Sequence, residues 1–133
     1  MISRTLTGPF FCSMLLISCT GTTALPHPTV CAIVDNPDSF LGQTITISGS
    51  WDASYHYTFI EDASCPKVGI SLSIPDEAMA QKDIKQFMKL AYGVGDGPEK
   101  PQGRGVFIGQ LRLEKPQGEA PHLVLDLHSF TEQ

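Results

Sequence analysis

Strict alternation of apolar and polar side chains is the feature that most constrains how this chain folds. In Gln43–Trp51, Ile45 and Ile47 share one parity, and threonines and serines occupy the other. The stretches Val68–Ile74 and His122–Phe130 alternate in the same way. Because successive side chains of an extended chain point to opposite sides of a sheet, this pattern predicts three half-buried strands.

Two further strands are expected from similar but less regular patterns. Tyr55–Glu61 follows the first strand closely, and we expect the short connection Asp52–Ser54 to form a hairpin between them. Arg104–Glu114 is the second of the two. The inward parity of this strand changes within Ile108–Leu111, which predicts a bulge near Gly109.

Helical spacing occurs in two places. Thr29 is a candidate N-cap for a short leading helix that Asn36-Pro37 should end, because a residue before proline is disfavoured in helical conformation. Across Glu77–Tyr92 an apolar stripe predicts a longer amphipathic helix that begins after Pro75. The stripe consists of Met79 or Ala80, Ile84, Phe87, Met88 and Ala91.

The order of these elements predicts a mainly β fold. Three strands, one helix and two strands form the order of a small five-stranded OB-like barrel, here preceded by a short N-terminal helix. The segment "NPDSFLGQTITISG" (Asn36–Gly49) resembles the entry of small OB-like secreted bacterial proteins, and the resemblance covers Thr29–Phe130. It implies the fold but no catalytic residues. A length of 133 residues suits one such domain.

An apolar run lies near the start of the chain, at Phe10–Ile17. As a helix its eight residues would rise about 12 Å, far short of the roughly 30 Å hydrocarbon core of a bilayer. The run has the dimensions of the hydrophobic region of a signal peptide. The alternative is a helix or strand buried in the domain. The threonine- and glycine-rich segment that follows the run argues against this alternative, because it is a poor continuation of a core element.

The run ends at Leu16-Ile17-Ser18-Cys19, which resembles the lipobox of bacterial lipoproteins. This resemblance implies cleavage before Cys19 and attachment of acyl chains such as palmitate to that residue. The expected organisation is a signal peptide (1–18), a flexible tether (19–28) and the OB-like barrel (29–133). Because Thr20 and not aspartate follows the cysteine, the resemblance further implies an outer-membrane protein that faces the periplasm.

The four cysteines divide into three groups. By the lipobox resemblance, Cys12 would leave with the signal peptide and Cys19 would be the lipidation site, so that Cys31 and Cys65 would remain as a pair in an exported domain. We expect a disulfide between them, which would hold the leading helix over one end of the barrel. A zinc site or a reactive thiol are the alternatives, and zinc would need two further ligands.

Two sets of residues are candidates for a site. His122, Asp126 and His128 share one parity of the last strand and form a possible metal or acid–base cluster, although a solvated strand face shows the same pattern. Trp51, Tyr55 and Tyr57 gather near the first hairpin and form a possible stacking surface, although packing in the core and rim of a small barrel is the favoured explanation. Asp35, Asp38, Glu61 and Asp62 are interpreted as turn and loop residues.

The net charge and the lack of catalytic motifs reduce the range of functions to be considered. Nine Lys and Arg stand against 14 Asp and Glu, giving a formal net charge of −5, so we expect no binding to nucleic acid. The chain contains no catalytic signature. We therefore expect a non-catalytic envelope lipoprotein without cofactor or metal, whose partner beyond the membrane is an envelope protein or glycan, or which has a structural role. A metal-binding or hydrolytic protein that uses the last strand is the alternative.

Overall fold

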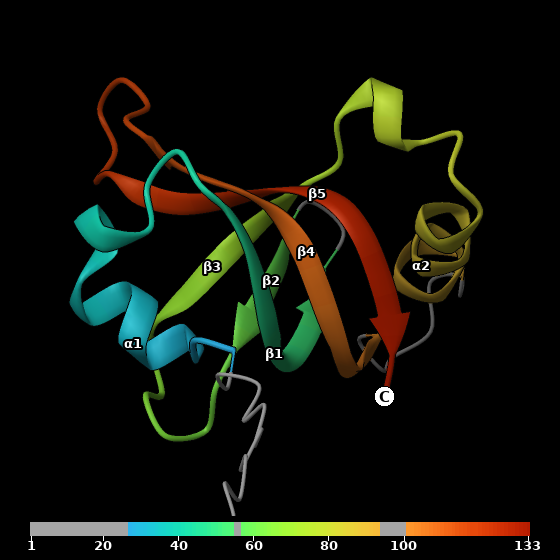
Figure 1. Cartoon of the computed structure of the whole chain (residues 1–133), viewed down its shortest axis with the longest axis horizontal. Helices are drawn as coiled ribbons and strands as arrows, with labels where there is room; N and C mark the ends of the chain where they lie inside the picture. Colours follow the sequence, from blue (N-terminus) through green and yellow to red (C-terminus); the bar gives the residue numbers. More distant parts are fainter. Residues whose placement is uncertain (1–26, 55–56, 94–100) are drawn as a thin grey trace, which may run out of the picture.

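Five strands close into a barrel in the computed structural model, which describes residues 27–54, 57–93 and 101–133 (Figure 1). Around the barrel the order is β1-β2-β3-β5-β4, and β4 pairs again with β1. Only the β3–β5 pair is parallel. The predicted OB-like barrel is therefore confirmed. The strands are β1 (Thr44–Ala53), β2 (Thr58–Glu61), β3 (Gly69–Ser73), β4 (Gln102–Glu114) and β5 (His122–Glu132).

The short leading helix α1 (Val30–Asp35) lies at one end of the barrel (Figure 1). It begins as predicted, because the Thr29 hydroxyl accepts a hydrogen bond from the Ala32 N–H at 3.1 Å. Val30 and Ile33 are fully buried against the barrel. After Asn36 a 3-10 turn, η1 (Pro37–Ser39), leads towards β1.

A disulfide joins α1 to the loop between β2 and β3. It connects Cys31 and Cys65, whose Cα atoms lie 5.6 Å apart, within the usual range for this bond. The predicted pairing is confirmed. The bridge fixes α1 where its two buried residues cover the barrel end.

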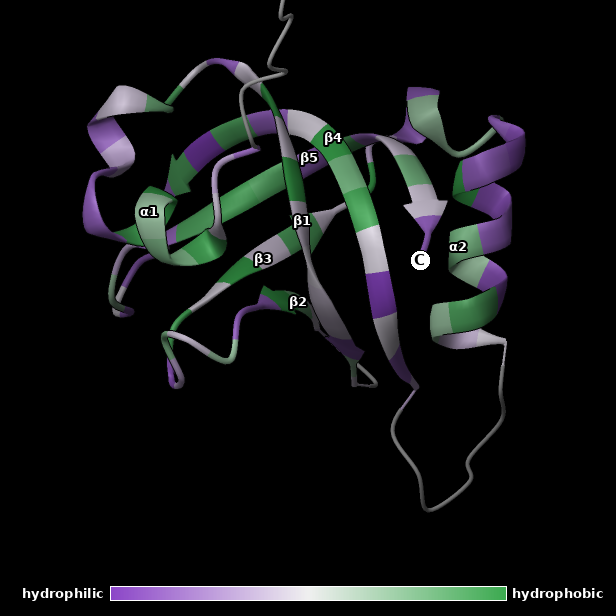
Figure 2. Cartoon of the chain, turned by 60° about the horizontal axis from the view of Figure 1, so that its bottom comes forward, coloured by the Kyte–Doolittle hydropathy of each residue, from purple (hydrophilic) through white to green (hydrophobic). Residues whose placement is uncertain are grey.

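The second helix, α2 (Lys82–Tyr92), covers the other end of the barrel, and its hydrophobic bands face the strands in Figure 2. Its central side chain, Phe87, is fully buried. The Phe87 ring contacts rings from three strands, at centroid distances of 5.3 Å to Trp51, 5.8 Å to Phe107 and 4.6 Å to Phe130. This aromatic cluster fills the end of the core.

The start of the long helix differs from the prediction. Where a continuous helix was expected from Glu77, a 3-10 turn, η2 (Asp76–Ala78), comes first, and α2 begins only at Lys82. Gln81 has an extended conformation (φ −71°, ψ 142°), which separates the two. The break lets Ala78 enter the core and leaves Met79, a predicted member of the stripe, exposed.

The hairpin between β1 and β2 also differs from the prediction. Asp52 and Ala53 continue β1, where they pair with Phe59 and Thr58, and are not part of the connection. The alternation of buried and outward-facing side chains along β1 continues to the end of the strand, where Ala53 is buried. Ser54 and Tyr57 exchange two backbone hydrogen bonds at the turn, and β2 begins one residue later, at Thr58.

The predicted bulge is confirmed in place, but the extra residue lies on the partner strand. Ile108 pairs with Ser129 and Gly109 pairs with Leu127, so His128 of β5 is left without an opposite residue. The parity of β4 therefore does not change, and Ile108 points outward. Gly109 is required here, because a Cβ atom would clash with the Asp126 carbonyl oxygen.

The predicted signal peptide, the lipobox with Cys19, and the tether up to residue 26 lie outside the described residues, as does Tyr55. In the described part of the chain, no helix is long and apolar enough to cross a membrane.

Asp83 fastens α2 to β5. Its carboxylate accepts hydrogen bonds from the Phe130 N–H and the Ser129 hydroxyl, both at 2.9 Å. Burial disfavours the charged carboxylate, but these hydrogen bonds outweigh burial, so the pKa of Asp83 lies below its ordinary value. The bonds meet β5 directly beside the bulge at His128.

Loss of the disulfide should destabilise the barrel strongly. The bridge spans 34 residues in sequence, and constraining a loop of that length stabilises a fold by about 4 kcal/mol in the chain-entropy model. We expect urea unfolding to show this loss for the double variant Cys31→Ser/Cys65→Ser and for the reduced wild type. The double variant should not respond to reductant. Equal unfolding midpoints for oxidised wild type and double variant would contradict this assignment.

The contribution of Asp83 should depend on pH. A carboxylate whose pKa is lowered by folding stabilises the fold above its unfolded pKa of about 3.9, and this contribution disappears as the pH falls through the folded pKa. We expect Asp83→Asn to lower the free energy of unfolding by about 1 kcal/mol at neutral pH, and the difference to shrink below about pH 4. The matched control is Asp76→Asn, at an exposed carboxylate. A loss for Asp83→Asn that stays constant down to about pH 3 would refute the assignment.

Candidate functional site

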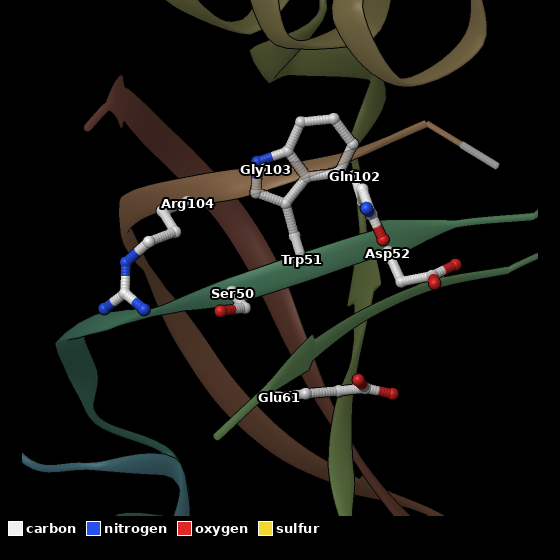
Figure 3. Close-up of a pocket in the computed structure, with 7 residues that line it drawn as sticks. All are labelled: Ser50, Trp51, Asp52, Glu61, Gln102, Gly103 and Arg104. Atoms are coloured by element: carbon white, nitrogen blue, oxygen red, sulfur yellow. The ribbon is translucent and has the colours of Figure 1, made fainter. Parts of the chain in front are cut away.

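A polar recess of about 410 Å³ lies on the outside of the barrel, over β1, β2 and β4. We call it the β1 recess. Figure 3 shows its residues: Ser50, Trp51, Asp52, Glu61, Gln102, Gly103 and Arg104.

Strand register places the polar members of the β1 recess side by side. Ser50 pairs with Glu61 of β2 on one side and with Arg104 of β4 on the other. Asp52 pairs with Gln102 in the next outward row. All five side chains point outward because their neighbours along the strands, such as Trp51 and Ile60, are buried in the core.

The floor of the β1 recess depends on close packing below it. The Trp51 indole lies against Gly103, where a Cβ atom would come within 2.9 Å of the ring. Figure 3 shows the ring on the opposite side of β1 from the Ser50 side chain. The ring therefore belongs to the core. Its contact with Gly103 holds β1 against β4 beneath the β1 recess.

The charged groups of the β1 recess are not paired with one another. Across the described residues, no ion pair or side-chain hydrogen bond involves Asp52, Glu61 or Arg104. Arg104 and Glu61 stand on either side of β1, so their backbones are two strand spacings apart, about 10 Å. The short Ser50 side chain between them leaves the space open.

One further carboxylate lies near Arg104. The pKa of Asp62 is lowered, mainly by the hydrogen bond from the Ser64 N–H and, to a smaller extent, by the positive charge of Arg104. Asp62 therefore adds negative charge beside the β1 recess.

Two of the three residues of the predicted aromatic surface, Trp51 and Tyr57, differ in their exposure. Trp51 is 4% exposed and packs edge-on against Phe87, so packing explains it. Its indole Nε1 has no hydrogen-bond partner among the described residues. Tyr57 is 62% exposed and stacks on Phe59 with ring centroids 6.0 Å apart. A binding role for Tyr57 stays a prediction, and Tyr55 lies outside the described residues.

Two residues of the candidate cluster on the last strand, Asp126 and His122, contact side chains of β4. The Asp126 carboxylate accepts a hydrogen bond from Arg112 Nε at 2.9 Å, and His122 lies 3.5 Å from the Glu114 carboxylate. The hydrogen bond from Arg112 to Asp126 raises the pKa of the guanidinium. His128 stands apart from these pairs, at the bulge.

No group of three or more His, Cys, Asp or Glu residues in the described ranges could hold a metal ion. The contacts of Asp126 with Arg112 and of His122 with Glu114 favour the interpretation of a solvated strand face.

Sequence reasoning did not find the β1 recess. The predicted strand Tyr55–Glu61 does end at Glu61, but this residue was also grouped with turn and loop residues, and Asp52 was expected in a connection although it lies in β1. For Ser50 and Arg104, the alternation of the strands indicated only that their side chains point outward. Which outward residues become neighbours depends on the register of three strands.

No protein-family model matches this chain, and no curated protein matches it.

Proposed function

We propose that this protein is a lipid-anchored bacterial envelope lipoprotein whose barrel is a non-catalytic binding module. The sequence Leu16-Ile17-Ser18-Cys19 directly after an apolar run supports the anchor. Acyl chains on Cys19 would hold the mature chain at the membrane, since each buried methylene contributes about 0.8 kcal/mol and two or more chains suffice for stable attachment. Thr20 is the basis for placing it in the outer membrane, facing the periplasm.

The disulfide supports export. Disulfides persist in the periplasm and outside cells but are rare in the bacterial cytoplasm. The bridge joins Cys31 and Cys65, the two cysteines that remain after Cys12 is removed and Cys19 is acylated. This agreement between the lipobox and the pairing is the observation on which the proposal chiefly rests.

The β1 recess supports a binding role. It offers a guanidinium, two carboxylates, a hydroxyl and an amide on three adjacent strands. A rigid sheet holds these groups, as a binding site requires. Envelope proteins, glycans and small polar molecules are the candidate ligands. Nucleic acid is not, because an acidic domain repels a polyanion.

Lipidation is the part of this proposal that can be tested most simply. We expect the protein, expressed in a diderm bacterium with labelled palmitate, to carry the label and to fractionate with membranes. Cys19→Ala should abolish the label, because it removes the acceptor thiol.

The matched control is Cys12→Ala, which changes a cysteine of the signal peptide and should leave the label unchanged. Label retained on Cys19→Ala, or a mature N-terminus other than Cys19, would refute the anchor.

A further inference from the structure

We propose that the β1 recess binds a small zwitterion that carries a primary ammonium group and a carboxylate, such as a free amino acid or the end of a short peptide. The ammonium would lie among Ser50, Asp52 and Glu61, and the carboxylate would lie on Arg104. This inference rests on the proposed binding role and names the ligand class for it.

The acceptors of the β1 recess match an ammonium group. An ammonium has three N–H donors and no acceptor. Ser50 supplies a hydroxyl oxygen. Asp52, two residues further along β1, and Glu61, which pairs with Ser50 from β2, each supply a carboxylate. In Figure 3, Arg104 lies to the left of Ser50, and the Asp52 and Glu61 carboxylates lie to its right.

Arg104 matches a carboxylate. A guanidinium presents its donors in a planar fork that binds a carboxylate through two parallel hydrogen bonds. Since Arg104 forms no ion pair within the described chain, its donors are available to a ligand. Arg104 and Glu61 flank β1 and are not paired with each other, so a molecule that lies between them can contact both charges.

The presence of both signs of charge favours a zwitterion over a dianion or a neutral sugar. The β1 recess holds two carboxylates and one guanidinium, so a dianion would meet repulsion and a neutral sugar would leave desolvated charges without partners. A ligand with one charge of each sign satisfies both ends. A volume of about 410 Å³ holds an amino acid or a dipeptide.

The test uses the ¹⁵N-labelled protein as produced in bacteria, titrated with alanyl-alanine and followed by backbone amide shifts. We expect saturable shifts at Ser50, Asp52, Glu61 and Arg104. Removing either charge of the probe should weaken binding at least about tenfold, since a hydrogen bond to a charged group contributes about 1.5–3 kcal/mol. The two probes for this are N-acetyl-alanyl-alanine, which lacks the ammonium, and alanyl-alanine amide, which lacks the carboxylate.

Variants assign each end of the ligand. Arg104→Gln should bind the free dipeptide and its amide equally, because the partner of the carboxylate is gone. Glu61→Gln should reduce the preference for the free amine over the acetylated probe. The matched control is Arg112→Gln, which removes an outward arginine of the same strand outside the β1 recess and should bind like wild type. Retained amide dispersion will show that each variant is folded.

Several results would overturn the inference. These are the absence of saturable shifts, equal binding of the capped and free dipeptides by wild type, and an unchanged preference in Arg104→Gln. Tighter binding of phosphoethanolamine than of alanyl-alanine would also overturn it, by assigning a phosphate and not a carboxylate to Arg104. The titration follows amide shifts of the barrel and does not depend on the acyl chains. A negative titration would therefore overturn the ligand assignment without bearing on the lipid anchor, which palmitate labelling tests.

Discussion

The packing of Phe87 against three other aromatic rings is the interaction on which the rest of the structure depends. Phe87 belongs to α2, whereas Trp51, Phe107 and Phe130 belong to β1, β4 and β5. These three strands are neighbours around the barrel. One helical side chain therefore fixes their inner faces together, and aromatic contacts of this kind add to the free energy gained from burial. The outer face of β1 and β4, with Arg104 and Ser50, inherits its geometry from this packing.

Most of the fold could be predicted because the strands have one buried and one solvated face. Ile45, Ile47 and Leu125 follow a period of two, and that period identifies strands without any knowledge of their partners. The disulfide could be predicted by elimination among four cysteines. Helix α2 was harder to delimit, because the extended residue Gln81 and the hydrogen bonds of Asp83 to β5 are tertiary effects. The bulge was assigned to the wrong strand for a similar reason, since Ile108 is apolar but points outward.

The candidate site could not be predicted in the same way. Parity indicates that Ser50 and Arg104 point outward, but it does not indicate that they stand opposite each other. A shift of one residue in register would reverse every side chain of a strand. The barrel closure, the register and the Trp51–Gly103 contact together determine which charges meet at the β1 recess. Histidines on the last strand gave a stronger sequence signal, yet His122 Nε2 lies 3.5 Å from the carboxylate of Glu114 on the partly exposed surface of the sheet.

Cross-strand nuclear Overhauser effects at Ser50 measure the register of β1 directly, and the β1 recess exists only in one register. The structure predicts contacts between backbone protons of Ser50 and those of both Glu61 and Arg104. Contacts from Ser50 to Gly103 or Gly105 as the directly opposite residue would contradict it. In that register Arg104 would no longer share the outward face with Ser50, and the barrel would have no β1 recess.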